Sequence, residues 1–353
     1  MATTAYNEDM AERVCIVGGG LAGLATAAAL APRGFQVTLL EARPRLGGRA
    51  GSFQDGPGGP LLDACQHVGM GCCTNLAHFF RTLGVAHLLQ THKTLYFLTP
   101  DRRVSVLQAD PLPAPLHLLR SFLGAHYLTG WEKARIAWGL ACLRLASENA
   151  DPPLAEWLRR HGQTPRTVER FWGLVLVSAL NESPERMGLK YARKVFLDGF
   201  LRHRQGFEVE IPSVPLGRLY GEETSAWLKS HGIKVCLGTG VRRFLIEHDR
   251  VAELETRDGQ RLQADWYVSA VPFDRLLGLL PGEVVQRPAC SANLANLETA
   301  PITSVHLWYE EPIMSLPHAV LIGCVGQWLF DRGSSAEGHY LQVVVSASRQ
   351  FRG

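Results

Sequence analysis

The chain has 353 residues, of which 46% are hydrophobic, so it holds enough apolar material for about two folded domains. Its 36 basic and 33 acidic residues leave a formal net charge of +3 with histidine neutral. This near balance gives no strong field for nucleic acid or another polyanion. The apolar content also excludes a disordered or fibrous protein.

The cysteines follow neither a C-x-x-C spacing nor the pattern of a small disulfide framework, so we expect reduced thiols in a reducing compartment. They are Cys15, Cys65, Cys72, Cys73, Cys142, Cys236, Cys290 and Cys324. Residues 1–13 lack the apolar segment of a secretory signal, and no apolar run approaches the roughly 20 residues that span a bilayer. We therefore expect a cytoplasmic location, with peripheral contact to the inner face of the cytoplasmic membrane.

The first elements form a strand–helix–strand unit. Residues 13–18 are a short apolar run stopped by three glycines, which is typical of a buried parallel strand. Residues 21–30 are rich in leucine and alanine and predict a helix that Pro32 and Gly34 close. Residues 35–40 predict a second strand, so the sheet should be parallel.

Between residues 110 and 203 the pattern predicts a helical insertion, because the apolar period is helical and prolines separate the segments. The helices are expected at 131–146, 154–161 and 167–180.

After residue 206 strands and helices alternate again. We expect a helix at 219–231, an extended segment at 233–237, a hairpin of 251–256 and 261–264 around Asp258-Gly259, and a strand at 265–271. Later strands, forming a second sheet, are expected at 303–309, 320–324, 327–330 and 340–347.

Residues 18–23 satisfy G-x-G-x-x-G between a predicted strand and a predicted helix. Gly18 permits a tight turn, Gly20 lets the backbone approach a pyrophosphate, and Gly23 lets helix and strand pack closely. Leu21 and Ala22 lie in the first helical turn. Glu41 ends the second strand, where its carboxylate would accept the hydroxyls of an adenosine ribose. These residues predict a dinucleotide site without distinguishing NAD from FAD.

The residues after Glu41 resemble one flavoprotein superfamily. Ala42 and Arg43 are followed by Gly47-Gly48-Arg49, an extension similar to that of the FAD-dependent amine oxidase and carotenoid (phytoene) desaturase superfamily. The resemblance implies FAD as cofactor, with Ala42, Arg43, Gly48 and Arg49 among its contacts.

The same resemblance implies an α/β fold: a Rossmann-like FAD-binding domain of the glutathione-reductase type, interwoven with an α+β substrate domain that has a helical insertion and a second mixed sheet. The expected bounds are 1–98 and 206–290 for the FAD-binding domain and 99–205 and 291–353 for the substrate domain.

A closer resemblance covers nearly the whole chain. The segments that carry it are 63–72, 181–186, 198–201, 211–216 and 305–309. They are similar to the squalene-associated FAD-dependent desaturases, the hydroxysqualene dehydroxylases of bacterial hopanoid and squalene synthesis. The resemblance implies reductive dehydroxylation of hydroxysqualene to squalene, with reduced FAD as hydride source. The chain departs from the family at Ala64 and Cys65, where asparagine and glycine are usual.

The resemblance also assigns site residues. It places Gln66 and His67 beside the flavin as catalytic residues, although a lone histidine in an apolar segment is more often a core residue. It assigns Val241 to the adenine and Pro272 to the strand end beside the dinucleotide. His306, Trp308 and Trp328 would line the substrate cavity; as aromatic strand residues they would otherwise belong to a core. No H-E-x-x-H or comparable signature predicts a metal.

Residues 116–126 mix leucine and phenylalanine with His117, Arg120 and His126, a composition typical of an interfacial helix or of an amphipathic helix packed on its neighbours. The expected partners are an apolar isoprenoid substrate, a membrane surface and enzymes of the squalene pathway, and no nucleic acid.

In the superfamily a last FAD-binding segment with a Gly-Asp pair follows the second sheet, and the printed sequence ends at Gly353 without one. We expect a chain that lacks this segment to bind FAD more weakly. Two alternatives stay open: a carotenoid desaturase or amine oxidase-like flavoenzyme, and a partial chain that binds nucleotide without turnover.

Overall fold

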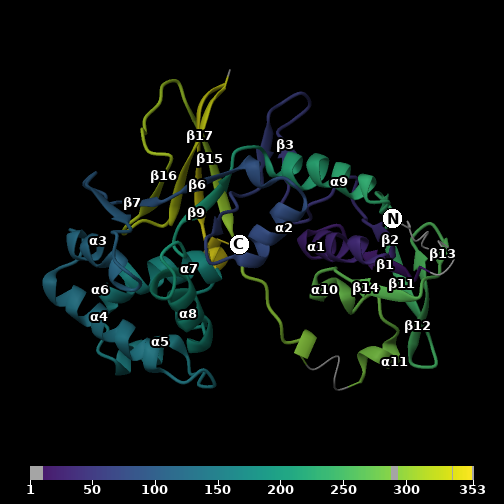
Figure 1. The fold of residues 1–353 in the computed structure, drawn as a ribbon, viewed down its shortest axis with the longest axis horizontal. Helices are drawn as coiled ribbons and strands as arrows, with labels where there is room; N and C mark the ends of the chain where they lie inside the picture. Colours follow the sequence, from purple (N-terminus) through teal and green to yellow (C-terminus); the bar gives the residue numbers. More distant parts are fainter. Residues whose placement is uncertain (1–10, 288–292, 336, 352–353) are drawn as a thin grey trace, which may run out of the picture. The chain divides into compact units, whose positions relative to one another are not determined.

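The computed structural model describes residues 11–287, 293–335 and 337–351, so Cys290 lies outside the described residues. The chain divides into two compact units. The first unit takes in 1–64, 75–89 and 212–298, and the second takes in 65–74, 90–211 and 299–353. Each unit is thus assembled from segments that lie far apart in sequence (Figure 1).

A four-stranded parallel sheet lies at the centre of the first unit, in the order β10-β2-β1-β14. Its strands are β1 (Arg13–Val17), β2 (Gln36–Leu40), β10 (Lys234–Cys236) and β14 (Trp266–Ser269). Helix α1 (Leu21–Leu30) connects β1 to β2. The predicted strand–helix–strand unit and its parallel sheet are therefore confirmed.

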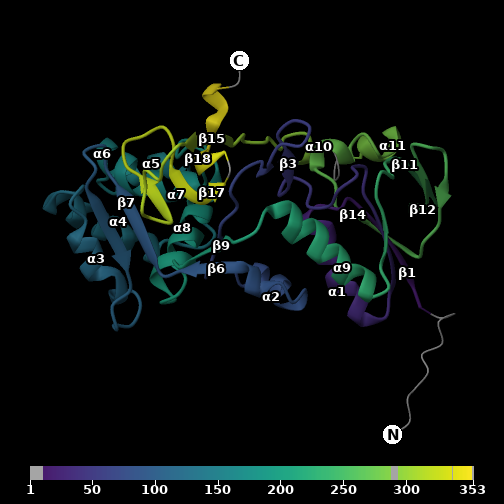
Figure 2. The same cartoon turned by 90° about the horizontal axis from the view of Figure 1, so that it is seen from above.

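Alternate side chains of β1 enter two different cores, because successive side chains of a strand point to opposite faces. Val14 and Ile16 pack with the helices, whereas Cys15 and Val17 pack with the antiparallel strands of the same unit. The helical layer holds α1, α2 (Thr74–Thr82) and α9 (Thr224–Ser230), with α9 running alongside α1 (Figure 2). A π-helical segment, Gly217–Glu223, precedes α9, so the predicted helix is present with a wider first turn.

The opposite layer is a three-stranded antiparallel sheet in the order β11-β12-β13. Its strands are β11 (Val241–Glu247), β12 (Arg250–Thr256) and β13 (Arg261–Leu262). The pairing of β12 with β13 confirms the predicted hairpin, and Gly259 supplies the left-handed turn with φ of +86°. The unit also contains β3 (Ser52–Gln54), β4 (Leu61–Asp63), α10 (Phe273–Leu276) and α11 (Gly282–Val285).

A six-stranded mixed sheet forms one part of the second unit, in the order β15-β18-β17-β16-β7-β8. Its strands are β7 (Thr94–Leu98), β8 (Val104–Gln108), β15 (Thr303–Tyr309), β16 (His318–Leu321), β17 (Trp328–Ser335) and β18 (Gly338–Val345). The four late strands confirm the predicted second sheet. Only the pairing of β16 with β7 is parallel among the described pairs of this sheet.

Helices form the other part of the second unit, which confirms the predicted helical insertion. They are α3 (Leu119–Gly124), α4 (Gly130–Leu145), α5 (Leu154–Arg160), α6 (Pro165–Thr167), α7 (Gly173–Leu180) and α8 (Leu189–Phe196). Thr129 and Glu132 start α4 with a capping box, each side chain bonding the backbone N–H of the other. Among the described residues, none of the helices combines the length and the apolar character that crossing a bilayer requires.

The boundaries of the two compact units differ from the predicted domain boundaries. Strand β5 (Gly69–Met70) pairs with β9 (Val209–Pro212), and β9 also lies beside β6 (Leu89–His92), so residues 65–74 join the second unit. Strand β7 joins the six-stranded sheet, which takes residues 90–98 into the second unit as well. The prediction assigned both segments to the FAD-binding domain because long-range pairing leaves no local signal in the sequence.

Candidate functional site

The three motif glycines each meet a different steric demand in the first unit. Gly18 has φ of +110°, a conformation that side chains disfavour. A Cβ on Gly23 would lie 1.9 Å from the carbonyl oxygen of Gly18, so only glycine allows α1 to pack this closely. A Cβ on Gly20 would find its nearest heavy atom at 3.8 Å, which leaves this face of the turn open to a ligand.

The N-terminus of α1 lies at this open turn. Gly20 caps the helix without a side-chain hydrogen bond, and no acidic residue lies in the first turn. The first N–H groups of a helix have no partner within it and carry its positive end, so Leu21 and Ala22 present donors suited to a phosphate.

The second pair of glycines passes directly over the first. The Gly47 N–H donates to the Gly19 carbonyl at 2.9 Å, and Gly20 and Gly47 form an isolated β-bridge. Gly48 has φ of +59°, and a Cβ there would lie 2.9 Å from the Cα of Gly20. The exposed Arg43 and Arg49 lie on either side of Gly47 and Gly48 in the sequence. Two cationic side chains are therefore close in sequence to the glycines that contact the N-terminus of α1.

Glu41 is buried at the end of β2, as the motif predicts. Its carboxylate accepts the N–H of Gly19 at 2.6 Å and of Arg43 at 2.8 Å, so it ties the glycine turn to the following loop. Ala42, between them, is exposed. The Glu41 carbonyl also accepts the Thr239 N–H at 2.9 Å, which brings the segment before the buried Val241 to the same end of the sheet.

The segment after β14 closes the other side of the turn. The Ala270 N–H donates to the Val17 carbonyl oxygen at 2.8 Å. A Cβ on Gly18 would lie 2.8 Å from the Ala270 carbonyl oxygen. Pro272 follows as the N-cap of α10. The first unit therefore brings the residues predicted for the cofactor to one edge of the parallel sheet, and the space kept clear at Gly20 fits the pyrophosphate of FAD.

Gln66 and His67 lie in the second unit. The buried Gln66 accepts from the Arg332 guanidinium through Oε1, and its Nε2 donates to the His67 carbonyl at 3.1 Å. His67 Nδ1 lies 2.9 Å from the Cys65 carbonyl, which only accepts, so Nδ1 carries a proton and donates in this bond. The motif does not predict Arg332, because its partner is 266 positions away in sequence. Neither Ala64 nor Cys65 is among the described residues with positive φ.

An apolar cavity of about 730 Å³ lies within the second unit. Its aromatic lining is supplied by Phe97, Phe122, Tyr127, Phe171, Phe196, Phe200, Trp328 and Phe330. Gln66 contributes an amide to the wall, and Arg144 contributes a charge. The volume and the apolar wall suit a long hydrocarbon ligand.

The three residues predicted for a substrate cavity separate in the structure. Trp328 lines the apolar cavity, and its ring stacks on Phe330 with centroids 5.4 Å apart. His306 and Trp308 are not among the lining residues. They share one face of β15 and stack with Tyr340 of β18, whose hydroxyl lies 2.7 Å from His306 Nδ1.

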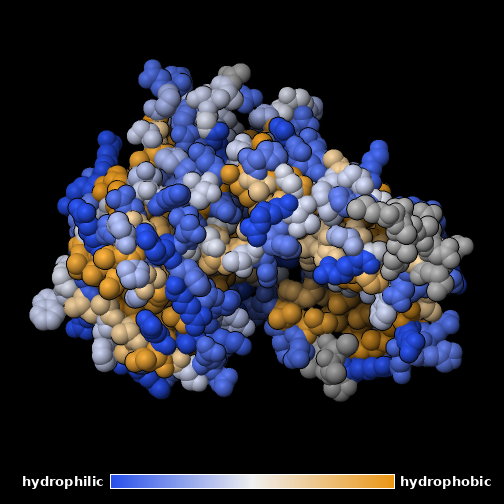
Figure 3. Space-filling model, viewed as in Figure 1, coloured by the Kyte–Doolittle hydropathy of each residue, from blue (hydrophilic) through white to orange (hydrophobic). Residues whose placement is uncertain are grey.

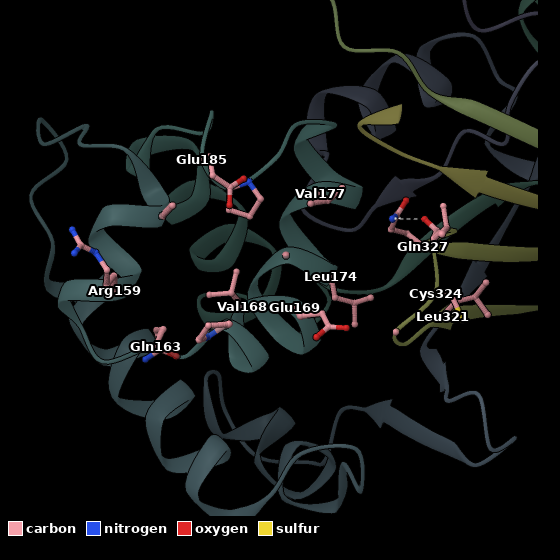
Figure 4. A pocket seen from close by; sticks show the side chains of 16 residues that line it. Arg159, Gln163, Val168, Glu169, Leu174, Val177, Glu185, Leu321, Cys324 and Gln327 are labelled. Carbon is pink, nitrogen blue, oxygen red and sulfur yellow. Dashed lines mark hydrogen bonds between the residues drawn. The ribbon is translucent and has the colours of Figure 1, made fainter. Parts of the chain in front are cut away.

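A second cavity, of about 760 Å³, lies between α5, α7 and the turn from β16 to β17 (Figure 4). Its wall includes Arg159, Glu169 and Glu185 as charged residues, with Leu174 and Cys324 nearby. This mixed wall suits a long hydrocarbon less well than the apolar cavity does.

Comparison with known proteins identifies relatives over most of the chain. Residues 21–350 match the family described as flavin containing amine oxidoreductases. A 15-cis-phytoene desaturase of an Oncidium hybrid cultivar is 29% identical over 313 residues, covering 85% of this chain and 53% of the plant protein. The 15-cis-phytoene desaturase of Synechococcus elongatus is 26% identical over 324 residues, covering 87% of this chain and 67% of its own length. The chain thus spans about half the length of the plant relative.

Solved structures share the fold at low identity. An oxidoreductase from Methanosarcina mazei superimposes with a TM-score of 0.73 at 16% identity, covering 96% of this chain and 80% of that one. Putrescine oxidase bound to putrescine superimposes with a TM-score of 0.68 at 16% identity, covering 98% and 78%. These likenesses, at 16% identity, establish the fold of the chain.

Proposed function

Because the chain belongs to the family of flavin containing amine oxidoreductases, we propose that it is an FAD-dependent oxidoreductase acting on a long apolar isoprenoid. The observation that carries the substrate class is the cavity of about 730 Å³ with its aromatic and aliphatic wall. When bound at the glycine turn of residues 18–23, FAD supplies the redox chemistry by accepting or returning a hydride equivalent.

Desaturation of a phytoene-type polyene is the first candidate reaction, because the curated relatives named above are phytoene desaturases. In this reaction the cavity wall needs no charged catalytic residue. The wall excludes water and holds the hydrocarbon chain of the substrate in an extended conformation. Trp328 and Phe330 offer one continuous apolar surface for that task, since their rings lie nearly parallel at 2°.

Reductive dehydroxylation of hydroxysqualene is the second candidate, and Gln66 is the observation that favours it. The Gln66 amide is held between Arg332 and the His67 carbonyl on a largely apolar wall. Such a fixed amide suits a substrate hydroxyl, which an apolar wall would leave without a partner. We propose Gln66 as the polar group that faces the substrate, with His67 beside it.

The test is to load the purified chain with FAD and incubate it anaerobically with phytoene, and, after reduction, with hydroxysqualene. Flavin bleaching with a product of longer conjugation supports desaturation, whereas flavin reoxidation with squalene formed supports dehydroxylation. We expect Gln66→Leu to lower the dehydroxylation rate at least about tenfold and to leave the flavin spectrum unchanged. Bound flavin without turnover of either substrate would contradict the proposed function.

We also propose that the cavity opens toward a membrane surface. A mouth patch of exposed apolar residues, visible as apolar surface over the region of α3 (Figure 3), surrounds part of its wall. The mouth patch consists of Val104, Val106, Leu112, Leu116, Leu119 and Leu123. Ser121 Oγ donates to the Gln108 carbonyl at 2.8 Å, so β8 and α3 lie side by side. Val106, Leu116 and Leu119 also line the cavity, which gives an apolar substrate an entry without exposure to water.

Vesicle binding checks this surface. We expect Leu119→Ser with Leu123→Ser to weaken sedimentation with phosphatidylglycerol vesicles at least about tenfold, since each leucine contributes about 1 kcal/mol of apolar transfer. The matched control is Ile313→Ser, an exposed apolar residue outside the mouth patch. Equal binding by the double variant and the control would exclude this patch as the docking surface.

A further inference from the structure

Two adjacent cysteines, Cys72 and Cys73, follow β5 in a turn that its backbone holds firmly. The Cys72 N–H donates to the Gly206 carbonyl at 3.2 Å, and the Cys73 N–H donates to the Met70 carbonyl at 2.7 Å. A Cβ on Gly71 would lie 1.9 Å from the Gln205 carbonyl oxygen, so the turn is pressed against the neighbouring loop. The two thiols are therefore positioned by the fold.

Both cysteines line the apolar cavity, with Cys73 exposed and Cys72 half-buried. The hydrogen bond from the Cys72 thiol, helped by the backbone at Met70, lowers the pKa of Cys73 to about 6, although partial desolvation of the thiol by the surrounding residues acts in the opposite direction. The same hydrogen bond and burial raise the pKa of Cys72, which keeps its proton. Near neutral pH the pair thus offers one nucleophilic sulfur and one proton donor.

The charged groups around the pair leave this arrangement intact. Asp198, which acts on Cys72, is paired with Lys194 at 2.7 Å and with Arg202 at 3.1 Å. Glu210, which acts on Cys73, raises the pKa of that thiol by less than the Cys72 hydrogen bond lowers it.

We propose that Cys72 and Cys73 form a covalent modification site for apolar α,β-unsaturated carbonyl compounds that enter the cavity. The Cys73 thiolate forms a C–S bond to the β-carbon, and the electron pair of the C=C π bond moves to the α-carbon. That carbon takes the proton of the Cys72 thiol, so one C–S and one C–H bond form while one π bond and one S–H bond break. No oxidant or reductant is needed, and the adduct lies in the cavity.

The apolar wall selects the hydrocarbon chain of the electrophile, and the thiol pair selects its reactive end. Each of the other described cysteines lacks either a place in the wall of the apolar cavity or a neighbouring thiol that lowers its pKa. Cys324 is exposed but lines the second cavity. Cys15 is buried, and burial raises the pKa of its thiol to about 12. The site goes beyond the proposed redox function, because it depends on the cavity and not on FAD.

In the experiment the intact chain is incubated with trans-2-nonenal, and N-acetylcysteine is treated in parallel as a reference thiol. Mass spectrometry follows the rate at which each cysteine is alkylated. We expect Cys73 to be alkylated at least about fivefold faster than Cys324 at pH 6.5. From pH 6.5 to 8.5 the rate at Cys73 should change less than about twofold, because a thiol with a pKa near 6 is already mostly ionised. The rate of N-acetylcysteine should rise roughly 50-fold over the same range.

Two further measurements separate this site from an ordinary exposed thiol. Squalane, an unreactive branched hydrocarbon, should slow alkylation at Cys73 at least about fivefold by occupying the cavity and leave Cys324 unchanged. Cys72→Ala should slow the reaction at Cys73 at pH 6.5 about tenfold, whereas Cys324→Ala should have no effect there. The proposal is overturned if Cys324 reacts as fast as Cys73 in the unaltered chain, or if squalane slows both sites equally.

Discussion

Gly23→Ala should destabilise the first unit by about 3 kcal/mol or more, because the added Cβ would lie 1.9 Å from the Gly18 carbonyl oxygen. Helix α1 would have to move away from β1, which opens the core around the fully buried Ile16 and Leu24. The higher helix propensity of alanine returns only about 1 kcal/mol. Urea denaturation followed by circular dichroism measures the loss, and native-like stability would contradict the close packing described for α1.

The matched control is Gly20→Ala, three residues earlier in the same motif. Gly20 has φ of −78°, which alanine adopts readily, and its Cβ would have its nearest heavy atom at 3.8 Å. We expect stability within about 0.5 kcal/mol of the native chain, since no contact is compressed. The added methyl group would instead occupy the face proposed for the pyrophosphate, so FAD affinity should fall at least about 30-fold in a flavin fluorescence titration. Unchanged affinity would place the cofactor elsewhere.

Trp172→Ala should cost the second unit about 4 kcal/mol, the range measured for buried aromatic residues truncated to alanine. Trp172 is fully buried, and its ring meets Phe196 edge-on at 4.9 Å. Its Nε1 donates to Gln163 Oε1 at 2.8 Å, so the change also leaves a buried acceptor without its donor. Because Phe196 lines the apolar cavity, the cavity wall should loosen together with the core.

Trp138→Ala is the control for this variant, since Trp138 lies on α4 with 62% of its surface exposed. We expect its free energy of unfolding to change by less than about 0.5 kcal/mol. Thermal denaturation of both variants, with binding of a fluorescent apolar probe as a second readout, tests the difference. Equal stability of the two variants would show that the core around Trp172 does not support the unit.

Local patterns were sufficient for the nucleotide-binding half. The glycine spacing, the apolar run of β1 and the acid after β2 are short local patterns. The structure gives Gly18 a positive φ, packs Gly23 against Gly18 and places Glu41 directly after β2. The predicted helices and late strands were confirmed for the same reason: hydrophobic period and proline breaks depend on a few consecutive residues.

The sequence by itself determined the strand–helix–strand unit and the glycine motif of a dinucleotide site, and its family resemblance indicated FAD. The tertiary structure decided which residues line a cavity. Trp328 lines the cavity and Trp308 does not, although both are aromatic residues on late strands. Arg332 reaches Gln66 across 266 positions, and β5 draws residues 65–74 into the second unit. The physical reason is that pairing and packing join distant segments by burial and hydrogen bonding, which no short stretch of sequence encodes.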